Sequence, residues 1–401
     1  MNVLTVNCGS SSLKMRLCAV GPSGVSTLAG GAVEAIGPDA VATFRLGNGT
    51  QTHVPVAAVD HRTALRGLLR LLPDEARRSI EAIGHRVVQG GAFALPAVID
   101  DAVLRAIDAG QRLAPLHNGP SLDGIGASRE ELPDVPMVAV FDTTFHNTLP
   151  KYASHYALPQ ELTLKHGLHR YGYHGIAHRS MMERYAELIG AATDRVSIIT
   201  LQLGNGCSAT AIRDGVSVDT SMGFTPLEGL MMGTRPGDLD PGALSYLLRE
   251  AGVSVEELDD ILNHRSGLLG VSGSSGDMAT LLAEEAQGYP RSRDAIEMFC
   301  YRVRKYIGAY IAVLGRVDAI VFGGGIGERS PEIRRRICEP LEPLGILIDE
   351  ELNTALTGDE GRCSTDDSHI AAWVIPSDEE CTIARDTFDL LARTQHHGRN
   401  T

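Results

Sequence analysis

Hydrophobic positions in the first part of the chain alternate or cluster over short distances that predict strands and helices. Residues 3–6 and 13–17 lie on either side of a small-residue segment, which predicts a strand, a tight turn and a returning strand. The other predicted elements here are helices at 60–72 and 97–113 and buried strands at 83–88 and 135–141. Near Pro150 the chain becomes polar and rich in His, Lys and Tyr, and we place a domain boundary there.

The second part of the chain repeats the opening pattern. Residues 197–203 predict a strand that enters the small-residue turn 204–208 and returns at 209–212. This recurrence suggests two related halves. The remaining predictions are a strand at 319–322 and helices at 242–251, 254–264, 293–314 and 378–394. The pattern therefore predicts an α/β fold with two related domains.

Two of these helices begin with the spacing of a capping box. Ser254 and Glu257 have this spacing, and so do Ser377 and Glu380. A capping box gives Glu380 a sufficient structural role. Its neighbour Glu379 is then available for another function, and a magnesium ligand is one interpretation.

The composition narrows the function classes. A chain of 401 residues with 43% hydrophobic residues can form sizeable cores, and two domains are expected at this length. The net charge of −14 argues against a nucleic-acid partner. The seven cysteines show no CxxC spacing, so neither a disulfide framework nor a zinc knuckle is indicated. We see no signal peptide and no apolar run long enough to span a bilayer, and therefore expect a cytoplasmic protein without a membrane partner.

Three glycine-rich turns follow predicted strands, at residues 7–12, 204–208 and 323–328. Backbone N–H groups at such turns bind anions, and Lys14 lies just beyond the first turn, within reach of a terminal phosphate. Each turn alone is better explained as a hairpin connection, but three together favour a nucleotide site. The chain has no P-loop motif. A Rossmann site is a weaker alternative, because Ser330 occupies the last glycine position of that fingerprint.

Two arginines and one aspartate occupy positions that indicate a functional role, and the arginines favour an anionic substrate. Arg86 lies within a strand that otherwise reads as buried, and Arg235 lies in a loop with little else to explain a cation. A buried arginine needs an anionic partner, which is either a structural ion pair or a carboxylate or phosphoryl substrate. Asp142 follows an apolar strand, a common catalytic position in open α/β sheets. A turn or helix cap is the alternative for Asp142.

His174 and His178 are four residues apart and can share one helical face. A zinc site is disfavoured, because the glutamate of the HExxH motif and a third ligand are both missing. The alternatives are a core histidine or a helix-start residue. The functional interpretation is a hydrogen-bond donor to charge that develops on a phosphoryl group.

Taken together, these segments resemble the acetate and propionate kinase family, within the larger group that shares the fold of sugar kinases, Hsp70 and actin. The resemblance runs nearly end to end through NCGSSSLK at 7–14, GHRVV at 84–88, APLHN at 114–118, VFDTTFH at 140–146, YGYHG at 171–175, LGNG at 203–206, TPLEGLMMGTRPGDLDPG at 225–242, GGIGE at 324–328 and DEE at 378–380. It implies two domains of the duplicated ribonuclease H-like type around a central cleft. The N-terminal domain would comprise residues 1–149 and 376–401, and the nucleotide-binding domain residues 150–375.

The resemblance also implies an activity and a set of site residues. The reaction would be the reversible transfer of the γ-phosphoryl group of ATP to acetate, giving acetyl phosphate and ADP, with Mg²⁺ or Mn²⁺. The catalytic residues would be Asp142, His174, Arg235 and Arg86. Arg86 would also bind the acid, together with a small apolar pocket formed by Val88, Leu116, Tyr173 and Pro226. The metal ligands would be Asn7 and Glu379. The nucleotide would contact Lys14, Gln202, Leu203, Gly204, Asn205, Gly206, Asp277, Met278, Ala279, Gly325, Ile326, Gly327, Glu328 and Arg329.

The sequence departs from the family at a few positions. Gln89 and Gln202 stand where the family often has His, Ala279 replaces a usual Arg, and Arg329 replaces a usual Asn. The last three lie on the nucleotide side and bear on the choice between ATP and GTP. Tyr173 replaces Phe and adds a hydroxyl beside the acid pocket, which bears on acid preference.

The chemistry needs no general base, because a carboxylate is already ionised at pH 7. The difficulty is the repulsion between an anion and a polyanion, which arginines, a histidine and a metal ion would relieve. We hypothesise that Asp142 orients the metal or the arginines. The alternatives are a propionate kinase, or a regulatory ATPase of the Hsp70 or actin kind. The family also implies a homodimer.

Overall fold

The computed structural model describes residues 1–9, 11–22, 24–37, 40–47, 49–56 and 58–398, without the side chains of residues 115, 116 and 394–398. Contacts divide the chain into two compact units, Met1–Thr144 with Asp378–Thr401, and Phe145–Ser377. Each unit is described by itself, and the two domains inferred from the sequence stay a prediction. In the described part of the chain, no helix is long and apolar enough to cross a membrane.

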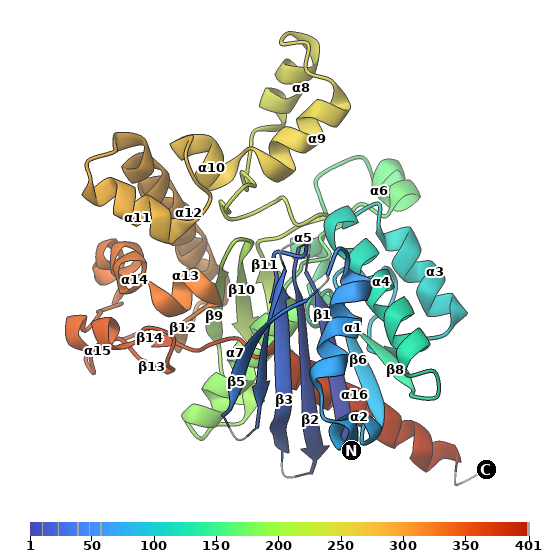
Figure 1. Cartoon of the computed structure of the whole chain (residues 1–401). Coiled ribbons are helices and arrows are strands. Elements are labelled where there is room, and N and C mark those ends of the chain that lie inside the picture. Colours follow the sequence, from blue (N-terminus) through green and yellow to red (C-terminus); the bar gives the residue numbers. More distant parts are fainter. Residues whose placement is uncertain (10, 23, 38–39, 48, 57, 399–401) are drawn as a thin grey trace. The chain divides into compact units, whose positions relative to one another are not determined.

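The first unit is built on one mixed sheet whose strand order is β5-β4-β3-β2-β1-β6-β8-β7. Its strands are β1 (Asn2–Cys8), β2 (Leu13–Gly21), β3 (Gly24–Glu34), β4 (Val41–Leu46), β5 (Gln51–Pro55), β6 (Ala82–Val87), β7 (Ala97–Val98) and β8 (Met137–Phe141). The predicted strand pair at the start of the chain is the antiparallel pair β1 and β2, and β1 also pairs in parallel with β6 (Figure 1). Strands β6 and β8 are parallel as well, so three strands end at the same edge of the sheet.

Helices cover both faces of this sheet. They are α1 (His61–Leu71), α2 (Asp74–Arg78), α3 (Asp101–Gly110), α4 (Pro115–Glu131) and α16 (Glu379–Gly398). Alternate residues of β1 and β2, such as Leu4, Val6 and Met15, enter the apolar core with α1 and α4. The other alternate set, which includes Asn7 and Arg16, faces the first turn of α16.

One helix predicted in the first unit needs correction. The helical segment at 97–113 begins with the short strand β7, and α3 starts only at Asp101 because the Asp100 side chain caps it by accepting from the Val103 N–H. On the face of the sheet that α16 covers, the packing explains why residue 84 is a glycine. A side chain at Gly84 would collide with Thr387 and Ile383, so the absence of a Cβ lets α16 pack directly on β6.

The second unit repeats the sheet pattern of the first. Its strand order is β11-β10-β9-β12-β14-β13. The strands are β9 (Ile198–Leu203), β10 (Cys207–Arg213), β11 (Val216–Thr220), β12 (Ala319–Gly323), β13 (Gly361–Arg362) and β14 (Ala371–Val374). Strand β9 pairs antiparallel with β10 and parallel with β12, as β1 does with β2 and β6. The duplication suggested by the sequence is thus visible in the topology, which is of the ribonuclease H-like type.

The helices of the second unit include α5 (Lys151–Ser154), α6 (Gln160–His166), α7 (Gly175–Leu188), α8 (Pro241–Arg249), α9 (Val255–His264), α10 (Gly267–Ser272), α11 (Met278–Ala286), α12 (Pro290–Leu314), α13 (Gly324–Arg329), α14 (Pro331–Cys338) and α15 (Glu350–Ala355). Among these helices, α8, α9 and α12 were predicted. The long helix α12 packs against α10, α11 and α14 (Figure 1). Ser254 caps α9 by accepting from the Glu257 N–H. The third glycine turn is more regular than predicted, because Gly324 begins the short helix α13 directly after β12.

Candidate active site

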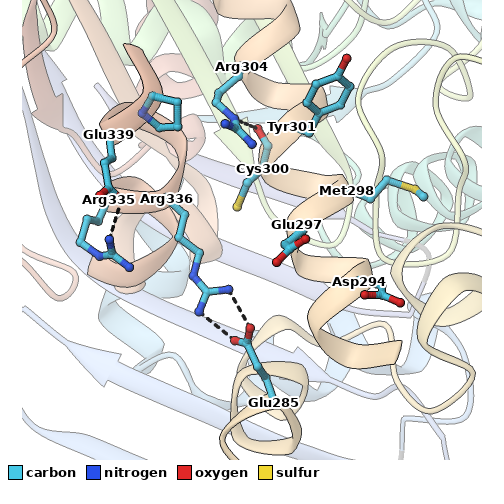
Figure 2. Close-up of a pocket in the computed structure, with 11 residues that line it drawn as sticks. Glu285, Asp294, Glu297, Met298, Cys300, Tyr301, Arg304, Arg335, Arg336 and Glu339 are labelled. Atoms are coloured by element: carbon cyan, nitrogen blue, oxygen red, sulfur yellow. Dashed lines mark hydrogen bonds and ion pairs between the residues drawn. The ribbon is translucent and has the colours of Figure 1, made fainter. Parts of the chain in front are cut away.

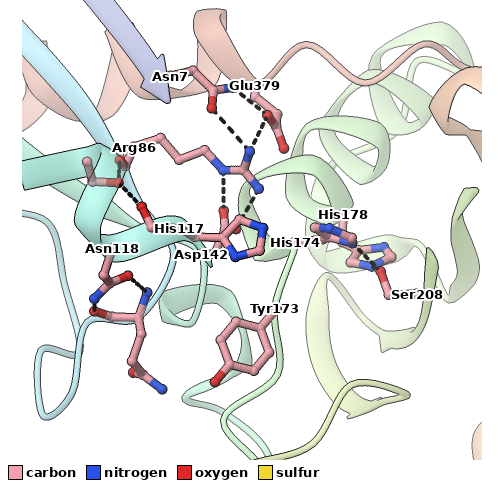
Figure 3. A network of polar contacts seen from close by, with 12 residues as sticks. Asn7, Arg86, His117, Asn118, Asp142, Tyr173, His174, His178, Ser208 and Glu379 are labelled. Atoms are coloured by element: carbon pink, nitrogen blue, oxygen red, sulfur yellow. Dashed lines mark hydrogen bonds and ion pairs between the residues drawn. The ribbon is translucent and has the colours of Figure 1, made fainter. Parts of the chain in front are cut away.

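Four polar residues of the first unit converge at the carboxyl edge of its parallel strands. Asn7 is near the end of β1, Arg86 near the end of β6, Asp142 directly after β8, and Glu379 at the start of α16. Figure 3 shows their side chains pointing toward one another. This is the edge where open α/β sheets place ligands, because parallel strands end there together.

Arg86 is the centre of this group. Its Nε and Nη2 donate to the two oxygens of Asp142 at 3.1 and 2.7 Å, and Nη1 donates to Asn7 Oδ1 at 3.1 Å. Nη1 also lies 3.3 Å from Glu379 Oε2, which accepts from Asn7 Nδ2 at 2.8 Å. Burial alone would lower the pKa of Arg86, but the carboxylates of Asp142 and Glu379 outweigh it and raise the pKa. Asp142 is completely buried, so the bidentate pair fixes the guanidinium plane.

A second arginine, which sequence reasoning missed, extends the group. Arg16 Nη1 donates to Asp378 Oδ1 at 2.7 Å, and its Nη2 lies 3.4 Å from Glu380 Oε2. The predicted capping box of Ser377 and Glu380 is wrong. Asp378 caps the helix instead, since its carboxylate accepts from the Cys381 N–H at 3.1 Å. Glu380 is thereby released to pair with Arg16.

The other site residues predicted in this unit are placed as follows. Lys14 lies opposite Asn7 in the β1–β2 pair, with an exposed side chain on the same face. Val88 is buried directly after β6. Leu116 lies in the first turn of α4, and its side chain is outside the described residues. Gln89 binds its neighbours through the backbone and side chain, and its N–H donates to Asn118 Oδ1 at 3.0 Å.

In the second unit, His174 and Arg235 meet at the glycine loop between β9 and β10. The position that a Cβ of Gly206 would take is 2.9 Å from Arg235 Nη2 and 3.6 Å from His174 Nε2. Arg235 Nη1 donates to the Pro226 carbonyl oxygen at 3.0 Å. Among the described residues, Arg235 has no carboxylate partner, and burial lowers its pKa. It is therefore a cation that lacks a counter-charge within the described chain, in contrast to Arg86.

His174 itself has an unusual backbone. It is the N-cap of α7 with φ 58° and ψ 22°, in the left-handed region that few non-glycine residues adopt. Its Nδ1 lies 2.8 Å from Ser208 Oγ, which is also 2.8 Å from His178 Nε2. His178 is fully buried in α7, so it is a hydrogen-bonded core histidine. Within the described residues, no group of three His, Cys, Asp or Glu side chains is placed to hold a metal ion.

Hydrogen bonds from Arg170 and Tyr173 stabilise the loop that carries Pro226 and Arg235 and the residues just before it. Arg170 Nη2 donates to Glu228 Oε1 at 2.5 Å, and Arg170 Nη1 donates to three consecutive carbonyl oxygens at residues 220–222. The Tyr173 hydroxyl donates to the Phe224 carbonyl oxygen at 2.8 Å. This hydrogen bond connects Tyr173 to the Pro226 loop.

The predicted nucleotide residues fall at the ends of β9 and β12 and at the start of α11. The end of β9 and its turn contain Gln202, Leu203, Gly204, Asn205 and Gly206. The start of α11 contains Asp277, Met278 and Ala279. Helix α13 contains Gly325, Ile326, Gly327, Glu328 and Arg329. Two of the acidic side chains have structural contacts, because Asp277 accepts from the Thr280 N–H and Glu328 from the Gly324 N–H, both at 2.8 Å. Gln202 Oε1 is a buried acceptor without a hydrogen-bond partner among the described residues.

Sequence reasoning also missed Arg334, which is completely buried in α14. Its guanidinium donates to the carbonyl oxygens of Gly327 and Glu328 at 2.7 and 3.1 Å, and to Asn353 Oδ1 at 2.8 Å. These bonds hold the last turn of α13, where carbonyls have no partners within the helix. The sequence signal for the burial of Arg334 was weak, because Arg334 is the first of three consecutive arginines.

A cavity of different character lies elsewhere in the second unit. It has a volume of about 740 Å³ and is lined by α12, α14 and neighbouring segments of the second unit (Figure 2). Two of its arginines are already paired, since Arg336 binds Glu285 at 2.8 Å and Arg335 binds Glu339 at 2.6 Å. None of the predicted site residues lines it.

Comparison with known proteins agrees over the whole chain. A model of the acetokinase family matches residues 2–385. An acetate kinase from Symbiobacterium thermophilum is 47% identical, with 98% of this chain and 99% of the relative covered. Among solved structures, acetate kinase from Porphyromonas gingivalis has 39% identity and a TM-score of 0.87, covering 97% of this chain and 99% of that chain. A propionate kinase from Francisella tularensis has 38% identity and a TM-score of 0.89, with the same coverage.

Proposed function

Given that this chain belongs to the acetokinase family and is an enzyme that transfers the γ-phosphoryl group of ATP reversibly to acetate, we propose that the Arg86 group and the Arg235–His174 group carry this transfer. The carboxylate oxygen of acetate forms the new bond to the γ-phosphorus while the bond to the β–γ bridging oxygen breaks. ATP becomes ADP and acetate becomes acetyl phosphate. No proton needs to be removed from the nucleophile.

The observation that supports the proposal is the burial of Arg235 without a carboxylate partner among the described residues. A guanidinium that is buried without a carboxylate partner among the described residues is costly, and an anionic ligand offsets that cost. The Pro226 carbonyl fixes one end of the group, and Nη2 is directed to the Gly206 loop. We assign Arg235 to the transferring phosphoryl group, whose charge it stabilises in the transition state.

His174 acts on the same charge in this proposal. Its Nε2 faces the Gly206 loop close to Arg235, so a donor there stabilises negative charge that shifts toward the phosphoryl oxygens. The left-handed backbone at His174 is strained for a residue with a side chain, and such strain at this point supports a functional role for His174.

Arg86 and Asp142 act as a unit. Both oxygens of the buried Asp142 hold the guanidinium of Arg86, so the proposed role of Asp142 is to orient Arg86 rather than to accept a proton. Arg86 then faces the acid and the phosphoryl group with a fixed plane. Val88, Leu116, Tyr173 and Pro226 are proposed to line the pocket for the methyl group of acetate. One methylene changes such discrimination by only about 1–3 kcal/mol, so propionate is the alternative acid.

We assign Asn7 and Glu379 to a magnesium ion that the ATP phosphates share. One amide oxygen and one carboxylate are suitable oxygen ligands, and Mg²⁺ in phosphoryl-transfer sites keeps most of its ligands from phosphates and water. The two side chains are neighbours, because Asn7 Nδ2 donates to Glu379 Oε2 at 2.8 Å. To hold the ion, Asn7 Oδ1 would exchange the hydrogen bond that it accepts from Arg86 for the metal. Bound Mg²⁺ would neutralise phosphate charge. Mn²⁺ prefers the same oxygen ligands and is the alternative.

The nucleotide is proposed to contact the β9 turn, the start of α11 and α13, with Lys14 near its phosphates. Glycines and backbone N–H groups at these points suit close approach of an anion. The family resemblance further supports a cytoplasmic homodimer. Light scattering coupled to gel filtration tests the dimer, and a molar mass of one chain at working concentration would contradict it.

The test of the proposed function is formation of acetyl phosphate, trapped as the hydroxamate with hydroxylamine. Protein, ATP, Mg²⁺ and acetate should give hydroxamate that an acetate-free control lacks. The variant Arg235→Gln should lower kcat by orders of magnitude, on the scale of arginine fingers. A variant that keeps kcat within twofold of wild type would contradict the assignment of Arg235. Phosphate release without acetate and without hydroxamate would instead favour a regulatory ATPase.

A further inference from the structure

Behind His174 lies a continuous chain of side-chain hydrogen bonds. Thr200 Oγ1 on β9 is 2.7 Å from His178 Nδ1, and His178 Nε2 is 2.8 Å from Ser208 Oγ on β10. Ser208 Oγ is in turn 2.8 Å from His174 Nδ1. Figure 3 shows the last three of these residues, with Ser208 beside the two imidazoles. Each of these three contacts therefore joins a hydroxyl to an imidazole nitrogen within hydrogen-bond distance.

The chain is buried, and this constrains its protons. Thr200, His178 and Ser208 are all completely inaccessible to solvent. Burial lowers the pKa of His178 well below its ordinary value, and the nearby imidazoles of His146 and His174 act in the same direction. His178 is therefore neutral and carries one N–H. One of its ring nitrogens donates and the other accepts.

Ser208 couples the donor–acceptor directions of the hydrogen bonds that it forms with the two histidines. Its hydroxyl has one proton, so it donates to one imidazole and accepts from the other. Consequently the three hydrogen bonds can run in only two ways, and all of them reverse together. If Thr200 donates to His178, then Ser208 donates to His174 Nδ1. If His178 donates to Thr200, then His174 Nδ1 donates to Ser208.

Thr200 decides between the two directions. Among the described residues, its hydroxyl contacts no polar group except His178 Nδ1. If it accepted from His178, its own proton would be buried without an acceptor, which is the costly arrangement for a polar group. If it donates, only an oxygen lone pair stays unused. The favoured direction therefore runs from Thr200 through His178 and Ser208 to His174 Nδ1.

In this direction the proton of neutral His174 is on Nε2. That nitrogen is the one that faces the Gly206 loop, 3.6 Å from the position of a Cβ at Gly206, and Arg235 Nη2 approaches the same position. The opposite tautomer would present a lone pair there, which repels a phosphoryl oxygen. We propose that Thr200, His178 and Ser208 are positioning residues that fix His174 in its Nε2–H tautomer as a hydrogen-bond donor. The catalytic consequence rests on the proposed role of His174, whereas the tautomer itself does not.

The direct test reads the tautomer by NMR. Histidine labelled with ¹⁵N gives different long-range ¹H–¹⁵N patterns for the two neutral tautomers, and the variants His174→Gln and His178→Gln assign the signals. In the wild type we expect both His174 and His178 as Nε2–H. In Ser208→Ala the His174 signals should shift toward a mixture of tautomers. An Nδ1–H tautomer of His174 in the wild type would overturn the proposal, as would an unchanged Nε2–H tautomer in both Ser208→Ala and Thr200→Val.

Kinetics supply the second readout. Ser208→Ala should lower kcat at least about tenfold, since a wrong tautomer at a catalytic histidine costs up to about 10⁴-fold. KM for acetate and ATP should change little, because no substrate contact is lost. Thr200→Val should lower kcat less, and Thr200→Ser should restore it. A fall in kcat that Thr200→Ser fails to restore would mean that the threonine only supports packing.

The matched control is Thr210→Val on β10. Thr210 is equally buried, and its hydroxyl is paired with Thr220 Oγ1 at 2.9 Å outside the chain to His174. This variant loses a buried hydroxyl pair but should keep both the tautomer and kcat. If it lowers kcat as much as Thr200→Val, the positioning role is refuted. If His174→Gln keeps full activity while the NMR result holds, the catalytic role of His174 fails and the tautomer assignment stands.

Discussion

Substituting Gly206 tests the placement of Arg235 without removing any charged group. An alanine Cβ at this position would lie 2.9 Å from Arg235 Nη2, whereas ordinary contact begins at 3.4 Å. Gly206 does not have a left-handed backbone, so alanine introduces no backbone strain. The guanidinium must therefore move by about 0.5 Å, and the Pro226 carbonyl restrains its other end.

The size of the effect follows from this displacement. A misplacement of 1 Å costs about 10²-fold in rate, so about half of that distance should cost about tenfold in kcat/KM for acetate, or about 1.4 kcal/mol. The stability cost should stay below about 1 kcal/mol, because the atom that gives way is the far end of a flexible side chain. A loss of activity without a loss of stability is the expected signature.

The assay is hydroxamate formation at varied acetate, with urea unfolding measured in parallel. Gly308→Ala in α12 is the control, because a Cβ there meets no atom within 4 Å and its backbone is not left-handed either. The control should retain kcat/KM. If Gly206→Ala keeps kcat/KM within twofold of wild type, the position of Arg235 does not matter to the reaction, and its assignment to the phosphoryl group is wrong.

Three further predictions follow from the first unit. Asp142→Asn should lower kcat at least about tenfold and destabilise the fold by about 3–5 kcal/mol, since it breaks a buried bidentate pair; near-normal turnover would show that Arg86 needs no orientation. Glu379→Gln should raise the Mg²⁺ concentration needed for half-maximal rate several-fold at unchanged KM for acetate, whereas an unchanged Mg²⁺ dependence would remove Glu379 from the metal site. Burial, with a contribution from Arg129, lowers the pKa of His85 to about 3, so the unfolded chain binds a proton near pH 6.5 that the folded chain does not. Stability should therefore fall by about 1.4 kcal/mol per pH unit from this group as pH drops from about 6 to about 4, and urea titrations should show that slope reduced in His85→Gln; equal slopes would contradict it.

The elements that the sequence predicted best were those with a clear period and a clear end. The alternating strands with small-residue turns gave both hairpins, because a period of two and a glycine turn leave few other structures. Arg86 and Asp142 were identifiable because charged residues at the ends of apolar strands are conspicuous. Their pairing was only one of the two roles hypothesised for Asp142, since it depends on β6 and β8 being parallel neighbours.

What the sequence could not show are contacts between residues with an ordinary local explanation. Glu380 has a capping-box partner in sequence, but Asp378 competes for the same helix start, and only the packing of α16 on β2 brings Arg16 to Glu380. Thr200 and Ser208 read as small polar residues in buried strands. Their hydrogen-bonded chain depends on where α7 places its two histidines. The meeting of Arg86 and Arg235 on one substrate stays a prediction, which non-additive kinetics of the double variant would test.

Arg86 and Arg235 differ in the charge of the side chains around them, and this difference provides a physical reason for the proposed metal ion. In the first unit, the guanidinium groups of Arg86 and Arg16 are surrounded by the carboxylates of Asp142, Glu379, Asp378 and Glu380. This group has an excess of negative charge, and even the nearby amine of Lys14 leaves it negative overall. By itself this net charge repels a carboxylate and a triphosphate, and the proposed oxygen-liganded divalent cation would offset that repulsion. Arg235, in contrast, has no carboxylate partner among the described residues and would attract an anion directly. In the proposed mechanism, phosphoryl transfer would therefore depend on the metal ion through the first unit and on an unpaired guanidinium through the second.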